Sequence, residues 1–203
     1  QRIGPTLQIT LTALIIALII GVGVGMFSAL HQYSAFDYIF MVLALVGVSM
    51  PIFWLGMMLV NFFSVNLGLL PVSGRGDIAN GLWDVISHMI LPCLCLCTIP
   101  MATFARITRS SMLEVIRSDS IKALRARGIS ERSVIFKHAL KNALPPIITV
   151  LGLQLASCFT GAILTENIFS WPGLGTMIVN GINNRDYMLI QGMVLFFAMV
   201  FVV

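Results

Sequence analysis

The stretch RITRSSMLEVIRSDSIKALRARGISERSVIFKHALK, residues 106–141, decides how this sequence folds. It holds nine of the chain's twelve Lys and Arg residues but only three of its eight acidic residues. The sequence on either side is apolar and nearly uncharged. Basic loops next to membrane helices are retained in the cytoplasm. We therefore expect 106–141 to be a cytoplasmic loop between two membrane-spanning helices.

The composition of the whole chain is that of a polytopic membrane protein. Of its 203 residues, 58% are hydrophobic and 10% are charged, whereas about a quarter of a soluble domain is charged. A helix needs about 20 apolar residues to cross a bilayer. We predict an all-α fold with five spans, at about 7–30, 38–66, 85–105, 143–165 and 188–203.

The cytoplasmic loop sets the direction of every predicted span. Residue 1 and the loops 67–84 and 166–187 then lie outside the cell. The N-terminus lacks the basic segment and cleavage site of a signal peptide, and the last apolar run has no polar end. We therefore expect a truncated chain whose intact form has about six spans. Since the positive charge is confined to one loop, we expect lipid and protein partners and no nucleic acid.

Glycine and proline mark special positions in the predicted spans. Gly21, Gly23 and Gly25 would let another helix approach the first span closely. Pro51 should kink the second span. The third span contains Pro92 and Pro100 and should not be a straight helix unless neighbouring groups satisfy the freed carbonyls.

The four cysteines lie in apolar runs, where a free cysteine behaves as a small hydrophobic residue. Cys93 and Cys97 share a helix face, but no second type of ligand accompanies them. We predict no metal site.

The central loop contains signals for two helices and a corner between them. Ser118 or Asp119 can cap a short helix through Arg127, and Gly128 suits the position after its end. Ser130 can cap the next helix. Residues 121–127 would span roughly 10 Å at about 1.5 Å per residue. A helix of this length has the size of an element that docks into a groove on a partner protein.

The predicted outer loop ENIFSWPGLGTMIVNGINNRDY, residues 166–187, mixes an aromatic and apolar core with turn-forming residues. We expect a folded hairpin or re-entrant turn at the outer surface, capped by Arg185 and Asp186.

Several separated motifs carry a resemblance to a known family. Lys122-Ala123-Leu124, followed after three residues by Gly128, resembles the EAA loop of inner-membrane permease subunits of binding-protein-dependent ABC importers. Lys122 stands where that motif has Glu, and Leu124 where it has a second Ala. Further segments resemble the dipeptide, oligopeptide and nickel branch: GVSMPIFWLGMML (47–59), RSSMLEV (109–115), RARG (125–128), HALKNALPP (138–146), ENIFSWPGLG (166–175) and RDYMLIQG (185–192).

The resemblance implies a type I ABC importer permease fold in the bacterial inner membrane, with five of about six transmembrane helices present in this chain. It implies a translocation subunit for dipeptides or oligopeptides, coupled to ATP hydrolysis by alternating access. Its implied partners are a second homologous permease subunit, two ABC ATPase subunits and a periplasmic or lipid-anchored solute-binding protein. The chain has no GxxxxGK[ST] phosphate loop, so we expect no enzyme activity or cofactor of its own, with ATP and Mg²⁺ bound by the partners.

The resemblance also assigns candidate site residues. Those expected to couple to the ATPase subunit are Lys122, Ala123, Arg125, Ala126, Arg127, Gly128, His138 and Asn142. Those expected to face the binding protein or shape the mouth of the pathway are Trp171, Pro172, Gly173, Gly175, Arg185 and Asp186. A basic loop that only sets topology is the alternative for the first group. A buried structural turn is the alternative for the second.

Three other functions compete with peptide import. A nickel or metal-chelate importer has the same subunit architecture, and a passive channel would need no capped loop. An intramembrane hydrolase would need a nucleophile and a base within the membrane. The chain has neither a GxSxG nor an HExxH motif and almost no ionisable residues within its spans.

Overall fold

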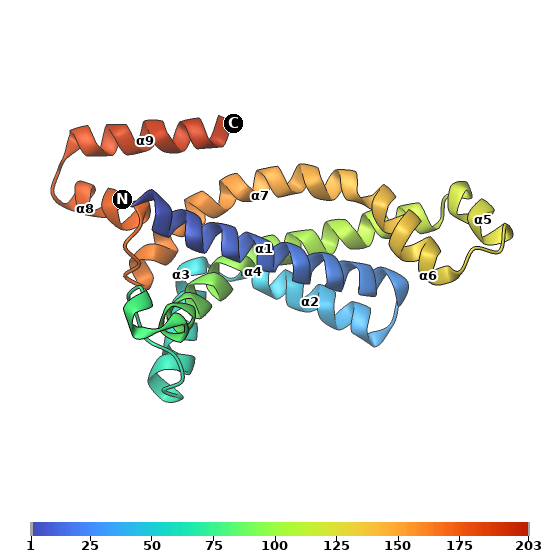
Figure 1. Cartoon of the computed structure of the whole chain (residues 1–203), viewed down its shortest axis with the longest axis horizontal. Coiled ribbons are helices and arrows are strands. Elements are labelled where there is room, and N and C mark those ends of the chain that lie inside the picture. The colour runs from blue at the N-terminus through green and yellow to red at the C-terminus, as the bar shows by residue number, and fades with distance from the viewer. Residues whose placement is uncertain (1, 203) are drawn as a thin grey trace. The chain divides into compact units, whose positions relative to one another are not determined.

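The computed structural model describes residues 2–202, with side chains for residues 2–199. Regular structure within this range is entirely helical, which confirms the predicted all-α fold (Figure 1). Residue 1, expected outside the cell, and residue 203, expected at the end of the last span, lie outside the described residues. In chain order the helices are α1 (Ile3–Leu30), α2 (Ala35–Ser49), α3 (Ile52–Leu59), the π-helix η1 (Val60–Asn66), the 3₁₀ turn η2 (Ile78–Asn80), α4 (Leu82–Ile116), α5 (Asp119–Ala126), α6 (Glu131–Ser133), the π-helix η3 (Val134–Ala139), α7 (Leu140–Ile168), α8 (Leu174–Asn183) and α9 (Tyr187–Val202).

The helices form two compact units. Unit 1 comprises Gln1–Ile15, Met50–Thr98 and Gln154–Val203. Unit 2 comprises Ile16–Ser49 and Ile99–Leu153. The predicted coupling segment belongs to unit 2, and both predicted outer loops belong to unit 1.

Three helical stretches among the described residues are long and apolar enough to cross a membrane: α1, α4 and the continuous stretch Glu131–Ile168. A fourth span results if α2 and the stretch Ile52–Asn66 are taken together across the break at Pro51. The apolar part of α9, Tyr187–Met199, is shorter. Each of the five predicted segments is therefore helical, and the expected disturbance at Pro51 is a complete break.

The helix α4 is longer than predicted. It runs through Pro92 and Pro100 without a break, and it continues to Ile116, well beyond the predicted end of the span. Met112 in this extension is completely buried, and the neighbouring Leu113 packs against the same core. Burial of apolar side chains stabilises the extra turns, so the first part of the predicted loop is helix.

Two of the three glycines in α1 allow it to pack closely on α4 in unit 2. A Cβ added at Gly21 would lie 2.6 Å from the Met101 carbonyl oxygen, and one at Gly25 would lie 2.7 Å from Cβ of Thr108. One at Gly23 would meet nothing within 4 Å. The prediction of close approach is confirmed for Gly21 and Gly25 and wrong for Gly23, because residues four apart share a helix face and residues two apart do not.

Candidate functional site

The predicted short helix of the coupling segment is present as α5, which follows α4 and precedes α6 in the chain and is labelled in Figure 1. Ser118 occupies its N-cap position with an extended backbone, although its hydroxyl donates to the Val115 carbonyl and not to the helix. At the other end, Gly128 adopts a left-handed φ of +75°.

Hydrogen bonds close this end as a Schellman motif. The Gly128 amide donates to the Arg125 carbonyl at 2.9 Å, and the Ile129 amide donates to the Leu124 carbonyl at 3.3 Å. Both ends of the helix therefore lie where the sequence predicted. Ser130 takes the N-cap position of α6, also as predicted.

One face of α5 is anchored in an apolar core. Ile121 is completely buried, and the half-buried Leu124 packs beside it. The buried residues of this core come from α1, α4, α5, η3 and α7: Ala29, Met112, Ile121, Val134, Ala139 and Ala143. The short helix is therefore seated on the ends of three long helices within unit 2.

The opposite face of α5 carries the predicted coupling residues. All six of them in this segment are exposed: Lys122, Ala123, Arg125, Ala126, Arg127 and Gly128. Lys122 donates to Asp119 at 2.8 Å. Arg125 donates through two nitrogens to Glu131, at 2.5 and 3.0 Å, and this hydrogen bonding raises the pKa of Arg125. The alanines and Gly128 leave a small-residue surface between charged groups.

His138 and Asn142 are the other two residues expected to couple to the ATPase subunit. The structure places His138 in the π-helix η3 and Asn142 in α7. His138 is half-buried and Asn142 is exposed. A coupling role for either residue stays a prediction.

The turn after α7, which was predicted to lie outside the cell, is largely buried in unit 1. Trp171 is completely buried, and its indole Nε1 donates to the Pro5 carbonyl at 2.9 Å. The Arg75 guanidinium lies 5.9 Å from the centre of the Trp171 ring, which is cation–π distance. The Gly74 amide donates to the Phe169 carbonyl at 2.8 Å. The loop before α4 is thus bonded to the turn after α7.

A buried carboxylate, Glu166, organises this turn. It accepts hydrogen bonds from the Thr6 hydroxyl at 2.5 Å, the Gly175 amide at 2.6 Å and the Thr176 amide at 3.3 Å. The two amides are in the first turn of α8, so Glu166 caps that helix from α7. A Cβ at Gly173 would collide with the Glu166 carboxylate. Glycine here therefore makes room for the acid.

The six predicted outer residues fall into two groups. Trp171, Gly173 and Gly175 are buried and Pro172 is half-buried, as in the alternative of a structural turn. Arg185 and Asp186 are exposed, and Asp186 accepts from the Leu189 amide at 3.1 Å in the first turn of α9. Contact of any of them with a binding protein stays a prediction.

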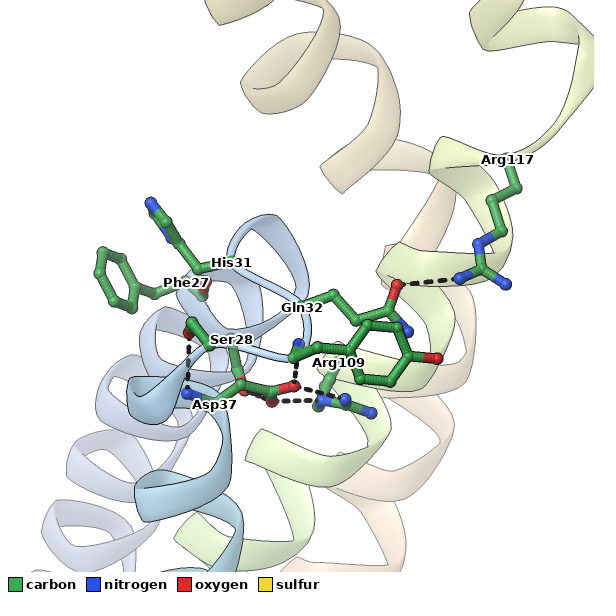
Figure 2. A network of polar contacts seen from close by, with 9 residues as sticks. Phe27, Ser28, His31, Gln32, Asp37, Arg109 and Arg117 are labelled. Atoms are coloured by element: carbon green, nitrogen blue, oxygen red, sulfur yellow. Dashed lines mark hydrogen bonds and ion pairs between the residues drawn. The ribbon is translucent and has the colours of Figure 1, made fainter.

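A second buried carboxylate, which the sequence analysis did not single out, lies in unit 2. Asp37 at the start of α2 has 2% of its side chain exposed and accepts from Arg109 of α4 through Nε at 2.6 Å and Nη2 at 2.7 Å (Figure 2). The Ser28 hydroxyl and the Tyr33 amide also donate to it. Asp37 and Arg109 are 72 residues apart in the sequence, so no local pattern pairs them.

Comparison with known proteins identifies the family. The model of the binding-protein-dependent transport system inner membrane component matches residues 21–203. The chain belongs to this family. It is therefore a multi-pass protein of the inner membrane, in agreement with the resemblance of the EAA-like segment.

Curated relatives come from several bacteria. The dipeptide transport system permease protein DppB of Alkalihalophilus pseudofirmus is 50% identical over 98% of this chain and 66% of that protein. DppB of Escherichia coli K12 is 44% identical over 97% and 65%. The oligopeptide transport system permease protein AppB of Bacillus subtilis is 41% identical over 100% and 65%. The chain spans just under two thirds of the length of these relatives.

A solved structure has the same fold. An inward-facing structure of the MetNI methionine ABC transporter matches with a TM-score of 0.74, over 98% of this chain and 88% of that chain, at 18% identity. The predicted type I importer permease fold is thereby confirmed.

Proposed function

We propose that this chain is the translocation subunit of an ATP-driven importer of dipeptides or oligopeptides, and that α5 docks on an ATPase subunit. The observation that carries the proposal is the two-sided character of α5. Ile121 fixes one side in the core of unit 2, while the predicted coupling residues are exposed on the other. A rigidly seated helix can transmit a force applied to its exposed face.

The exposed face has the chemistry of a docking surface. Ala123, Ala126 and Gly128 permit close approach of a partner backbone, and Lys122 and Arg127 offer positive charge to acidic groups. A loop that only sets topology would need the charge but neither the buried anchor nor the Schellman end. ATP and Mg²⁺ then belong to the two ATPase subunits, and a second permease completes the pathway.

On the outer side, we propose that Arg185 and Asp186 are the residues that meet the solute-binding protein, since both are exposed. Trp171, Gly173 and Gly175 are buried and would shape this surface from beneath. The names of the relatives, dipeptide and oligopeptide permeases, support peptides as the solute.

Site-directed crosslinking tests the docking proposal. The variant Ala126→Cys in the full-length subunit, assembled with its ATPase subunits, should crosslink to an ATPase subunit. Leu153→Cys, an exposed position on α7, is the control that should not. The four native cysteines are buried and can stay in place. Absence of crosslinks at every position from 121 to 128 would refute the docking assignment.

Two further measurements test the solute and the energy source. Titration of the binding protein should detect peptides, and tight Ni²⁺ binding without peptide binding would instead identify a nickel importer. Peptide uptake by the reconstituted complex should stop when ATP hydrolysis is blocked. Undiminished uptake would indicate a passive channel.

A further inference from the structure

The helix α2 has few buried contacts within the described part of unit 2. Of its residues, all of which are described, the structure buries Asp37 and Ala44. Most of its large apolar side chains, such as Leu43 at 59%, are well exposed. The Phe27 ring of α1 touches Phe36 and Phe40 edge to face, at 6.1 and 6.5 Å between centroids. Apolar packing alone therefore holds α2 weakly.

The strongest link of α2 to the rest of unit 2 is polar. The Asp37 carboxylate accepts hydrogen bonds from Nε and Nη2 of Arg109, from the Ser28 hydroxyl and from the Tyr33 amide (Figure 2). A bidentate pair between a guanidinium and a carboxylate fixes direction as well as distance. Asp37 thereby joins the start of α2 to both α1 and α4.

The same part of α4 also supports the coupling helix. Met112 lies three residues after Arg109, which is almost one helical turn, and is completely buried in the core that seats Ile121 of α5. The chain of contacts thus runs from α5 through the core to α4, and from Arg109 through Asp37 to α2. Every residue in it belongs to unit 2.

We propose that the Asp37–Arg109 pair is a positioning device that makes α2 move as one body with the coupling segment during transport, a role that rests on the proposed function of α5. A buried ion pair adds little net stability compared with apolar packing but can select one arrangement. Here the Asp37–Arg109 pair fixes the position of α2, which has little apolar packing of its own within unit 2. The exposed Gln32–Arg117 hydrogen bond, 2.8 Å long, joins the α1–α2 turn to the residue that follows α4, but it lacks the buried charge.

Distances between spin labels test whether the Asp37–Arg109 pair holds α2 against α4. This test does not depend on whether α5 docks on an ATPase subunit. Labels at Leu43→Cys on α2 and Ser110→Cys on α4, both exposed positions, are measured in the full transporter with and without ATP. We expect one narrow distribution that is the same in both states. Arg109→Gln should broaden it, and so should the double variant Asp37→Asn/Arg109→Gln, which leaves no unpaired charge. A wild-type distance that changes with ATP, or a distribution that stays narrow in both variants, would overturn the proposal.

Function is measured on the same complexes. In both variants we expect peptide uptake to fall roughly tenfold while ATP hydrolysis stays within about twofold of the wild type, because force reaches α4 but not α2. Arg109→Lys should restore part of the uptake, and Arg117→Gln is the matched control that should change neither activity. Uptake and hydrolysis falling by the same factor would indicate a merely structural role. The Ala126→Cys crosslink, made with Asp37 and Arg109 unchanged, tests the proposed docking of α5 separately. Absence of that crosslink can therefore be distinguished from loss of the Asp37–Arg109 link.

Discussion

Asp37 and Glu166 are both buried carboxylates in a chain that is otherwise nearly free of buried charge, but they are stabilised differently. Asp37 in unit 2 is held by the side chain of Arg109, 72 residues away in the sequence. Glu166 in unit 1 is held by the Thr6 hydroxyl and by amides of α8, nine and ten residues away. One acid is neutralised by a cation and the other by the positive end of a helix.

The two carboxylate sites therefore place different requirements on the sequence. The site of Asp37 depends on the charge and planarity of one partner side chain. The site of Glu166 depends on space near its carboxylate, which Gly173 and Gly175 provide. We therefore expect the Asp37 site to be most sensitive to the loss of charge, and the Glu166 site to be sensitive to added volume as well.

The largest effect is expected from Arg109→Gln, because it leaves the carboxylate of Asp37 buried without its cation. We expect a loss of about 3–5 kcal/mol in the free energy of unfolding, measured on the full-length subunit in detergent micelles. The double variant Asp37→Asn/Arg109→Gln should recover part of this loss. If the double variant is as unstable as Arg109→Gln alone, the unpaired charge of Asp37 is not the cause of the lost stability.

A smaller loss is expected from Glu166→Gln. Its side-chain oxygen can still accept one bond, but its NH₂ group would face donors and leave at least one amide of α8 unpaired. We expect about 1–3 kcal/mol in the same unfolding measurement. Thr6→Val removes another partner of this carboxylate and should act in the same direction. A loss as large as that of Arg109→Gln would mean that the two carboxylates are not distinguished by the nature of their partners.

Gly173→Ala tests the requirement for space. Its Cβ would overlap the Glu166 carboxylate, so we expect a loss of about 1–3 kcal/mol. Gly152→Ala in α7 is the matched control, because a Cβ there meets nothing within 4 Å and alanine favours helix. Equal stability of the two variants would contradict the close contact.

The smallest effect is expected from Arg117→Gln. Its bond to Gln32 is exposed, so we expect a change of less than about 1 kcal/mol in the free energy of unfolding. A large loss would mean that the α1–α2 turn depends on this second link as much as on Asp37.

Local sequence signals predicted the features that depend on neighbours along the chain. Ser118 and Gly128 marked the ends of α5. An N-cap residue is required directly before a helix, and a residue that tolerates a left-handed φ is required directly after it. Pro51 marked the disturbance after α2, since proline has no backbone donor, although Pro92 and Pro100 do not interrupt α4. The apolar runs predicted helices because only helices satisfy every backbone group in lipid.

Tertiary structure decided which of these local features are used. Gly21 and Gly25 face α4 and Gly23 does not, a distinction that depends on the direction of α1 relative to its neighbour. For Trp171 the sequence left open a face toward a binding protein and a buried structural turn. In the structure Trp171 is completely buried, and its indole donates to the Pro5 carbonyl of α1 within unit 1.

Composition, charge distribution and turn residues thus determined the fold class, the helical segments and the short helix α5. These follow from hydrophobicity and backbone geometry, which act over one or a few turns. The pairing of Asp37 with Arg109 and the seating of Ile121 against four other helical segments were decided only by the tertiary structure. Each joins residues far apart in sequence, and burial gives them their strength by removing competing water.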